Sequence, residues 1–175
     1  MLYLRPYKPC DAGKVVSWII DEKTFYQWSA GRMGTYPLTE ARLNDHYAAE
    51  AENPRYWTMT AYDDGGAVGQ LIMRFPDPAS RMMRFGFIMV ASSKRGKGYG
   101  KKMLRLAADY AFTFTEAETI TLGVFANNPA ARYCYEAVGF EHRPELDTIY
   151  PINGEEWLCL EMELTRERFY RGEEN

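Results

Sequence analysis

Three glycines alternate with basic or aromatic residues in the middle of the chain, directly after a long apolar segment. Gly96, Gly98 and Gly100 follow the apolar run Met83–Val90, and helical periodicity begins after Gly100. Alternating glycines let successive backbone N–H groups turn toward one concavity, and a helix N-terminus adds partial positive charge there. Each charge-assisted hydrogen bond is worth about 1.5–3 kcal/mol, so three or four of them suffice to hold a phosphate or a pyrophosphate. The nearby cations that raise the local potential are Lys94, Arg95, Lys97, Lys101 and Lys102.

The spacing of these glycines does not fit the two commonest phosphate-binding motifs. A P-loop requires Gly-x-x-x-x-Gly-Lys-Ser/Thr, whereas Gly100 is followed by two lysines. A dinucleotide-binding fingerprint requires Gly-x-Gly-x-x-Gly near the first strand, whereas the spacing here is Gly-x-Gly-x-Gly in mid-chain. Taken alone, the segment therefore indicates either an anion site of another kind or a glycine-rich connector with a solvated run of charge.

A second motif follows further along the chain, in the segment VFANNPAARYCYEAVGF from Val124 to Phe140. Together the two motifs resemble those of the GCN5-related N-acetyltransferase (GNAT) superfamily. The acyl-CoA motif of that family is Arg/Gln-x-x-Gly-x-Gly/Ala after a buried strand, and its next motif is Asn-x-x-Ala-x-x-x-Tyr-x-x-x-Gly-Phe. The matching residues are Arg95, Gly98 and Gly100 in the first motif, and Asn128, Ala131, Tyr135, Gly139 and Phe140 in the second. The resemblance is specific over residues 83–141.

The resemblance implies that acetyl-CoA is the co-substrate and that no metal takes part. The backbone of Ile88, Met89 and Val90, where two parallel strands splay apart, is then expected to pair with the pantetheine arm. Asn128 is expected to contact the pantetheine, and Tyr135 to point its hydroxyl at the CoA sulfur. The backbone N–H groups expected to hold the pyrophosphate belong to Arg95, Gly96, Lys97, Gly98, Tyr99, Gly100 and Lys101.

The chemistry of a phenol suits the role that the resemblance gives to Tyr135. Amine attack on a thioester expels a thiolate of pKa ~8.5, and a phenol of pKa ~10 can hydrogen-bond it as it forms. Full proton transfer is uphill by about 2 kcal/mol at those values, so we predict a strong hydrogen bond late in the step. The alternative for Tyr135 is an ordinary packed tyrosine. Cys134 is interpreted as a small core residue, because a thiol nucleophile needs a neighbouring base and the two histidines give no such spacing.

The sequence does not show which group removes the proton of the acceptor amine. At pH 7, deprotonation costs about 1.4 kcal/mol for an α-amine and about 4.6 kcal/mol for a lysine-type amine. One branch of the family carries a glutamate five residues before the motif asparagine, but Gly123 stands at that position here, and Phe85–Val90 contains no acid. Ordered water or a carboxylate elsewhere is the alternative, and the candidates are Asp77, Glu145 and Asp147.

An aromatic acceptor pocket is a further hypothesis, since the resemblance places that pocket at the first helices and the last loop. An aromatic lining could receive a cationic or apolar amine. The same rings could instead fill the core. The residues in question are Phe25, Tyr26, Trp28, Tyr36, Tyr150 and Trp157.

The first half of the chain must supply the sheet that carries these motifs. Leu2–Arg5 is predicted as a strand, and apolar residues at helical spacing after Asp11, the expected N-cap, predict a helix to Ile20. The segment from Asp21 to Pro37 is interpreted as irregular. A helix is predicted from Thr39 to Glu52. The strands Arg55–Tyr62 and Ala67–Phe75 are expected to form a hairpin around Asp63-Asp64-Gly65-Gly66.

The second half alternates strands and helices. Met83–Val90 is predicted as a strand buried on both faces, and the helix after Gly100 carries one apolar face. Thr119–Phe125 is predicted as a strand, followed by a helix from Asn128 to Val138 with Gly139 beyond its end. Phe140–Arg143 and Trp157–Leu164 are the last predicted strands, joined by a loop. The pattern predicts an α/β GNAT-like fold with about seven strands, a central splayed parallel pair, and about four helices on both faces.

Length and composition limit the remaining possibilities. A chain of 175 residues fits one domain, here a single acyltransferase domain over 1–175, and its net charge of −3 argues against a dedicated nucleic-acid binder. Three widely spaced cysteines predict neither disulfides nor a metal site, and the sequence offers neither a signal peptide nor a run that could span a membrane, so a cytoplasmic protein is expected.

The predicted function is therefore an acetyl-CoA-dependent N-acetyltransferase. The acceptor is expected to be a primary amine, either of a small molecule or of a peptide or protein N-terminus, which attacks the thioester directly in a ternary complex. The alternative is a non-catalytic acyl-CoA-binding or regulatory module, favoured by the glycine at position 123. The resemblance also allows a homodimer, to which the strand Trp157–Leu164 could contribute an edge, and the sequence does not decide between the two states.

Overall fold

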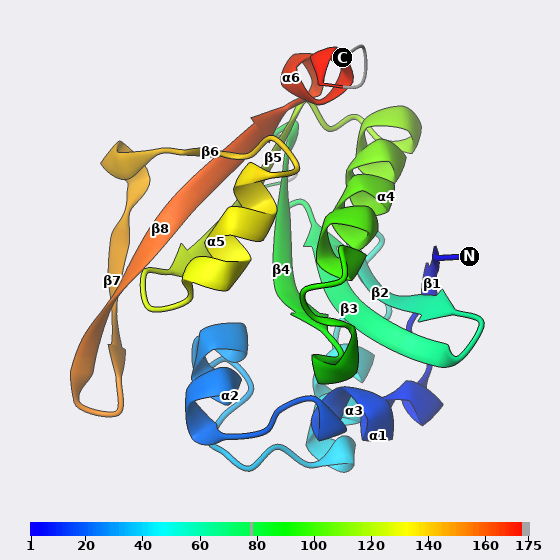
Figure 1. The fold of residues 1–175 in the computed structure, drawn as a ribbon, viewed down its shortest axis with the longest axis vertical. Coiled ribbons are helices and arrows are strands. Elements are labelled where there is room, and N and C mark those ends of the chain that lie inside the picture. Colours follow the sequence, from blue (N-terminus) through cyan, green and yellow to red (C-terminus); the bar gives the residue numbers. More distant parts are fainter. Residues whose placement is uncertain (78, 173–175) are drawn as a thin grey trace.

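One sheet organises the computed structural model, which describes residues 1–77 and 79–172; the eight strands of those residues all belong to it (Figure 1). The order across the sheet is β1-β2-β3-β4-β5-β8-β6, and β7 also pairs with β8. Neighbouring strands are antiparallel except β4 and β5, which are parallel, so the predicted mixed α/β class is confirmed. The strands are β1 Tyr3–Pro6, β2 Tyr56–Asp63, β3 Gly66–Arg74, β4 Met82–Val90, β5 Thr119–Phe125, β6 Glu141–His142, β7 Thr148–Ile152 and β8 Glu155–Thr165.

Helices lie on both faces of the sheet, as predicted, but the described residues contain six α-helices rather than about four. The helices α4 (Tyr99–Phe114) and α5 (Pro129–Glu136) pack on one face, where Leu104 and Ala107 belong to the larger core cluster. The other face is covered by α1 (Ala12–Ser17), α2 (Glu22–Ser29) and α3 (Glu40–Ala48), whose buried side chains form the second cluster. The short α6 (Arg166–Arg171) follows β8.

The N-terminal helices differ from the prediction in two places. Asp11 stands at the N-cap position of α1, but its side chain caps nothing there, because Arg5, Thr60 and Tyr62 donate to its carboxylate from β1 and β2. The segment interpreted as irregular contains α2. Asp21 caps that helix by accepting the N–H of Thr24 at 2.7 Å, a local signal that the sequence did offer. The predicted cap Thr39 of α3 is confirmed.

The parallel strands β4 and β5 are paired only at their beginnings. Met82–Arg84 is in register with Thr119–Thr121, and beyond those residues the two strands are no longer paired. The register between β4 and β3 shifts at the same level, and Phe87 adopts a left-handed φ of 45°. This bulge reverses which side chains of β4 face each layer, since Met83 and Phe85 belong to the larger core cluster and Phe87 and Met89 to the second. The predicted splay is therefore present. The strand buries side chains on both faces, as predicted, although its alternate residues are only partly buried.

The C-terminal region contains a hairpin that the sequence reasoning missed. The predicted loop from Pro144 to Glu156 includes β7, which pairs with the start of β8. Asn153 (φ 49°) and Gly154 (φ 80°) make the turn, and an Asn-Gly pair with two positive φ angles is a strong hairpin signal. Since β5 lies on one side of β8 and β6 and β7 on the other, the expectation that β8 offers a free edge to a second copy is wrong. Within residues 1–77 and 79–172 the structure has no helix with the length and apolar character needed to cross a bilayer.

Candidate acyl-CoA site

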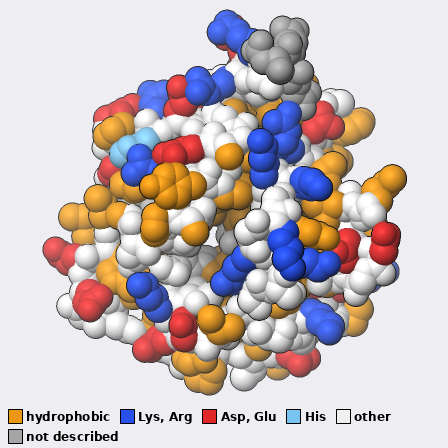
Figure 2. Space-filling view, viewed as in Figure 1, with side chains coloured by type: hydrophobic (Ala, Val, Ile, Leu, Met, Phe, Trp, Pro, Cys, Tyr) orange, Lys and Arg blue, Asp and Glu red, His pale blue; other side chains and the backbone are white. Residues whose placement is uncertain are grey.

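A cavity of about 560 Å³ lies where β4 and β5 separate. The N-terminal turn of α4, the helix α5 and three residues of α2 (Thr24, Gln27 and Trp28) complete its wall, so segments far apart in the sequence meet there (Figure 1). Figure 2 shows this face hollowed near its centre, with Lys and Arg side chains beside the hollow. The position matches the predicted one, at the point where the parallel pair splays.

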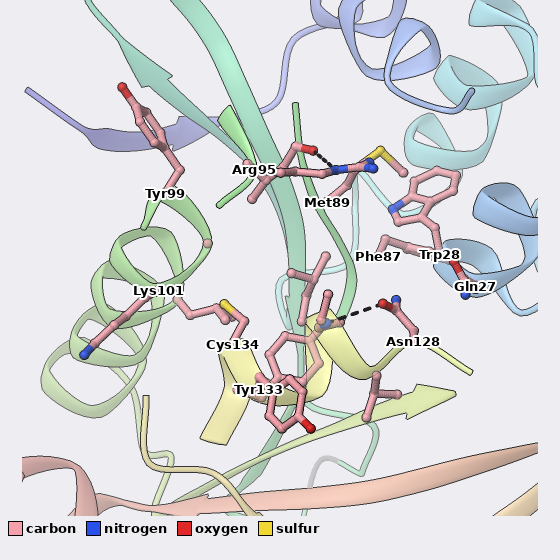
Figure 3. Close-up of a pocket in the computed structure, with 18 of the residues that line it drawn as sticks. Gln27, Trp28, Phe87, Met89, Arg95, Tyr99, Lys101, Asn128, Tyr133 and Cys134 are labelled. Carbon is pink, nitrogen blue, oxygen red and sulfur yellow. Dashed lines mark hydrogen bonds between the residues drawn. The ribbon is translucent and has the colours of Figure 1, made fainter. Parts of the chain in front are cut away.

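All of the predicted site residues except Lys97 line this cavity. Lys97 points elsewhere, since its ammonium group donates to the carbonyl of Ser93 at 2.9 Å. Figure 3 shows Tyr99 and Lys101 with side chains directed away from the cavity centre, so that these two residues present mainly their backbone. The predicted residues in the lining are Ile88, Met89, Val90, Arg95, Gly96, Gly98, Tyr99, Gly100, Lys101, Asn128 and Tyr135.

The glycine loop has the conformation that a backbone anion site needs. Gly96 and Gly98 adopt left-handed φ angles of 70° and 78°, which other residues rarely reach, and no atom lies within 4 Å of where their side chains would be. Gly98 is the N-cap of α4 and supplies no capping side chain, so the first N–H groups of the helix have no side-chain acceptor from the cap. At Gly100 a Cβ atom would lie 2.9 Å from Cys134 Sγ, because α4 and α5 approach closely there. The open space beside Gly96 and Gly98, together with the first N–H groups of α4, which have no side-chain acceptor from the cap, fits a diphosphate.

The cations around the loop have individual partners. Lys94 pairs with Asp63 of the β2–β3 turn and lies 4.8 Å from the centre of the Tyr99 ring, and the Tyr99 hydroxyl donates to the same carboxylate at 2.8 Å. The hydrogen bond from Lys94, followed by the one from Tyr99, lowers the pKa of Asp63 to about 2. Lys94 thus anchors the loop to the hairpin rather than adding to a free run of charge.

Two of the expected pantetheine-binding groups already have protein partners. Arg95 Nε donates to the Val90 carbonyl at 3.1 Å, which occupies one of the two lone pairs of that oxygen (Figure 3). Asn128 caps α5 by accepting the N–H of Ala131 at 3.4 Å, so only its amide nitrogen is left to donate to a ligand. Gln27 donates at 3.1 Å to both the backbone and the side-chain oxygen of Asn127 and so ties α2 to the start of α5.

Tyr135 lines the cavity and is otherwise buried. Burial raises its pKa above the ordinary value of 10.0, so the phenol is fully protonated at neutral pH. Burial also raises the pKa of the neighbouring Cys134 thiol, which keeps that group neutral and a poor nucleophile. Tyr135 and Cys134 therefore give the cavity lining a hydrogen-bond donor and an unreactive thiol.

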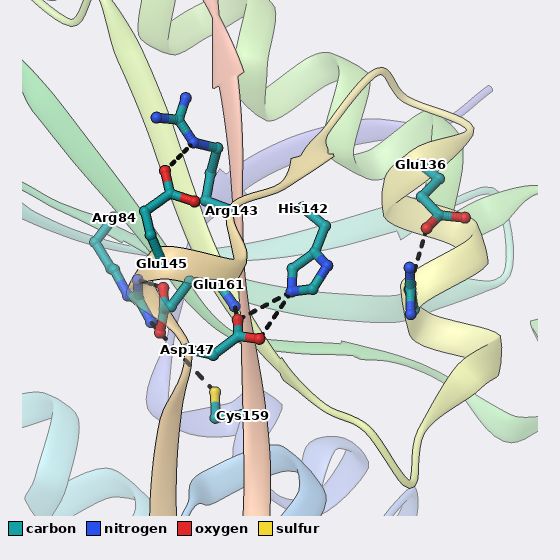
Figure 4. A network of polar contacts seen from close by, with 9 residues as sticks. Arg84, Glu136, His142, Arg143, Glu145, Asp147, Cys159 and Glu161 are labelled. Atoms are coloured by element: carbon teal, nitrogen blue, oxygen red, sulfur yellow. Dashed lines mark hydrogen bonds and ion pairs between the residues drawn. The ribbon is translucent and has the colours of Figure 1, made fainter.

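None of the three candidate bases lines the cavity. Asp77 accepts the N–H of Ala79 in an exposed loop, and Glu145 pairs with Arg143 at 2.8 Å. The Asp147 carboxylate lies 3.0 Å from His142 Nε2 and accepts the backbone N–H of Glu161 at 2.9 Å (Figure 4). Glu145 and Asp147 therefore stabilise the region before and around the C-terminal hairpin, and Asp77 stabilises its own loop between β3 and β4.

The space beside Gly123 is filled from neighbouring strands. A Cβ atom at Gly123 would lie 2.7 Å from Cys159 Sγ, 2.9 Å from an Arg84 nitrogen and 3.1 Å from Glu161 Oε1. Glu161 is the register partner of Gly123 on β8, and its carboxylate forms a two-point ion pair with Arg84 (Figure 4). Sequence reasoning missed this ion pair, because only the strand register brings residues 84, 123 and 161 together.

Of the six aromatic residues considered for the acceptor pocket, only Trp28 lines the cavity. Its ring lies 5.3 Å from that of Phe87, a second lining residue that the sequence reasoning did not single out. The indole N–H of Trp28 is buried and has no hydrogen-bond partner among the described residues. The rings of Tyr150 and Trp157 pack on Phe125, and Phe25 and Tyr26 belong to the core.

The described residues contain no group of three or more His, Cys, Asp or Glu side chains that could hold a metal ion. The arrangement is that of a binding site for a long ligand with an anionic end, and the protonated phenol of Tyr135 is part of its lining. Sheet topology, splay and glycine loop together define the class of acyl-CoA-binding acyltransferases.

Comparisons with known proteins agree with this class. The family model for the acetyltransferase (GNAT) family matches residues 16–140, and the chain therefore belongs to that family. The predictions of the family, of the fold class, of an N-acyltransferase enzyme and of acetyl-CoA as co-substrate are confirmed.

The individual relatives either match only part of this chain or have low sequence identity to it. A spermidine N(1)-acetyltransferase of Vibrio cholerae is 36% identical over 67 residues, which is 38% of this chain and 39% of that protein. An uncharacterized N-acetyltransferase of Bacillus subtilis, YhfO, is 27% identical over 142 residues, 79% of this chain and 89% of the relative. The crystal structure of spermidine N-acetyltransferase from Vibrio cholerae with CoA and spermine superposes with a TM-score of 0.81 at 20% identity, covering 97% of this chain and 98% of that one. At that identity the structural likeness concerns the fold.

Proposed function

We propose that this protein transfers the acetyl group of acetyl-CoA to a primary amine by direct attack in a ternary complex. The observation that carries the proposal is one continuous cavity whose lining extends from the glycine loop, past Tyr135 and the splayed strands, to Trp28 of α2. A diphosphate held at one end and an amine entering at the other would meet between β4 and β5.

The loop residues hold the cofactor end in this proposal. The N–H groups from Gly96 to Lys101 would bind the diphosphate, since the N–H of Arg95 already donates to the Ser92 carbonyl at 3.3 Å. The free edge of β4 near Ile88 and Met89 would pair with the amide groups of the pantetheine arm. Bound acetyl-CoA supplies a thioester, whose carbonyl carbon accepts a nucleophile and whose thiolate leaves.

Tyr135 is assigned the stabilisation of the leaving thiolate. Its raised pKa makes complete proton transfer to sulfur less favourable than the ordinary phenol value would suggest. The phenol therefore acts by donating a hydrogen bond as negative charge develops on sulfur. The proton stays on the tyrosine oxygen, and the product thiolate takes its proton from solvent.

The acceptor amine must lose its proton with little help from the cavity wall. No carboxylate or imidazole is among the described residues that line it. Water is therefore the proton acceptor in this proposal, and the cost at pH 7 is about 1.4 kcal/mol for an amine of pKa ~8 against about 4.6 kcal/mol for one of pKa ~10.4. Amines of lower basicity are the better substrates on this account.

The names of the relatives support an amine acceptor. Spermidine and spermine are the acceptors named for the bacterial relatives, and we extend to this chain the coarser class, a primary amine of a small molecule or of a peptide N-terminus. Polyamines carry several ammonium groups, and the described cavity lining offers them no carboxylate.

The test is release of free thiol from acetyl-CoA in the presence of an amine panel, with the acetylated product identified by mass spectrometry. Turnover with at least one amine, slowed by Tyr135→Phe without loss of CoA affinity, is the expected result. Tight CoA binding without turnover of any amine, unaffected by that substitution, would support a non-catalytic acyl-CoA-binding module instead.

A further inference from the structure

A row of polar side chains crosses the sheet on the face that carries α1–α3. Its members are successive register partners in neighbouring strands, so their side chains point to the same side of the sheet. Tyr56 of β2 is opposite Arg74 of β3, and Arg74 is opposite Arg84 of β4. Arg84 is in register with Thr121 of β5, which is opposite Glu163 of β8. We refer to Tyr56, Arg74, Arg84, Thr121 and Glu163 as the polar row.

The polar row lies beside the point where the cavity reaches this face. Gly86 and Gly123 both line the cavity and follow Arg84 and Thr121 by two residues on their strands. Two residues of extended strand span about 7 Å, and residues two apart point to the same face. The Arg84 guanidinium reaches this point, since one of its nitrogens lies 2.9 Å from where a Cβ atom of Gly123 would be, and Arg74 is the register partner of Arg84 on β3.

Positive charge in this region exceeds the number of carboxylates that pair with it. Arg84 pairs with Glu161 (Figure 4), but neither Arg74 nor Arg32 of the α2–α3 segment has a carboxylate within 4 Å among the described residues. The guanidinium of Arg32 donates to the Tyr150 hydroxyl at 3.5 Å, which brings it to the same face.

Of these arginines, Arg74 has the least favourable electrostatic surroundings. It is half-buried, it stands directly opposite another arginine, and like charges placed opposite one another destabilise a sheet. Burial first, and then the charges of Arg32 and Arg84, lower the pKa of its guanidinium, while Tyr56 and Glu50 oppose that effect. Thr121 of the same row has a buried hydroxyl without a hydrogen-bond partner among the described residues. An oxyanion bound here would satisfy these groups together.

We infer that the amine acceptor of this enzyme carries an oxyanion, a carboxylate or a phosphate, several bonds from its amino group, and that Arg74 and Arg32 bind it. This inference rests on the proposed function and narrows its acceptor class. Arg74 supplies a planar two-point donor suited to carboxylate and phosphate, and Arg84 adds charge while its own pairing with Glu161 stays intact. The proposal separates this chain from relatives named for polyamine acceptors.

The substrate test compares acceptors that differ only in the remote group. Glycine, β-alanine, γ-aminobutyrate and aminohexanoate vary the distance between amine and carboxylate, and the corresponding aminoalkylphosphonates test phosphate in its place. n-Butylamine and putrescine replace the oxyanion with a methyl or an ammonium group. We expect kcat/KM for the best oxyanion-bearing amine to exceed that for both matched amines by at least about tenfold. A higher kcat/KM for putrescine or butylamine would overturn the inference while leaving the proposed function intact.

The variant test asks whether Arg74 produces that preference. Arg74→Gln should lower the ratio of kcat/KM for the oxyanion-bearing amine to that for butylamine by about tenfold or more, and Arg74→Glu should shift the preference toward putrescine. Arg81→Gln is the matched control, since Arg81 pairs with Glu118 at the exposed end of the sheet and should not change the ratio. CoA affinity measured by calorimetry verifies that each variant is folded. An unchanged ratio in a folded Arg74→Gln protein would overturn the inference, whereas failure of every amine with the unsubstituted protein would overturn the proposed function.

Discussion

The two ends of the cavity are built in different ways. The cofactor end consists mostly of backbone: a glycine loop, the start of α4 and the free edge of β4. The acceptor end is lined by side chains from separate elements, such as Trp28 of α2 and Phe87 of β4, and the proposed acceptor-binding arginines lie beyond this lining. Backbone recognition suits a ligand common to a whole family, whereas side chains on separate elements can be exchanged without disturbing the loop. The comparison indicates that the cofactor is recognised by chain conformation and the acceptor by residue identity.

The largest expected effect is on kcat, for a substitution of Tyr135 between the cofactor end and the acceptor end. Tyr135→Phe removes one hydroxyl and keeps the buried ring, so kcat should fall by about 100-fold or more while the Kd of CoA stays within about twofold. Steady-state kinetics and calorimetry measure the two quantities. A variant whose kcat is within about threefold of the parent would show that the phenol is merely packed.

A second prediction concerns the closeness of the loop to α5. Gly100→Ala places a methyl group 2.9 Å from Cys134 Sγ, so α4 and α5 must separate and CoA affinity should fall by about tenfold. The double variant Gly100→Ala/Cys134→Ala removes the sulfur and should recover most of that loss. Equal affinities for the single and double variants would contradict the steric explanation.

These first two predictions concern residues that could be found from sequence alone. The motif spacing identifies Gly98, Gly100, Asn128 and Tyr135 because neighbours along the chain build the cofactor end. The polar row could not be found in this way, since residues 74, 84 and 121 meet only through strand register and the register depends on a bulge at Phe87. The helix α2 was missed although Asp21 and Thr24 form a standard capping pair, so that error was one of interpretation.

A smaller effect on CoA affinity is expected for Asp63, which anchors the glycine loop through Lys94 and Tyr99. Asp63→Asn weakens the link to Lys94 and Tyr99, and CoA affinity should fall by about three- to fivefold because the loop is less well fixed. The folded pKa of Asp63, about 2, is below its ordinary value of 3.8. Its contribution to stability is therefore present above pH 3.8 and is lost as the pH falls toward 2.

Urea unfolding at several pH values measures that contribution. The parent protein should be more stable than Asp63→Asn at neutral pH, and the two should converge as the pH falls toward 2. A stability difference that stays constant through this range would contradict the assigned ion pair.

The smallest expected effect concerns the reactivity of Cys159, whose sulfur lies beside Gly123. Burial, followed by the charge of Glu161, raises the pKa of Cys159 to about 11, so very little thiolate is present at pH 8. With a thiol reagent, the exposed Cys10 should react first and Cys159 last. Cys10→Ser should abolish the fast phase. A fast phase that persists in that variant, and that peptide mapping assigns to Cys159 rather than to the partly exposed Cys134, would show that the sheet face beside Gly123 is more open than the structure indicates.

The central claim is that one cavity holds CoA by its backbone end and brings the sulfur to Tyr135. A crystal structure of the protein with bound CoA tests it most directly. We predict diphosphate oxygens within hydrogen-bond distance of the N–H groups between Arg95 and Lys101, and the sulfur within hydrogen-bond distance of the Tyr135 hydroxyl. A diphosphate bound away from the glycine loop, or a sulfur far from Tyr135, would contradict the account.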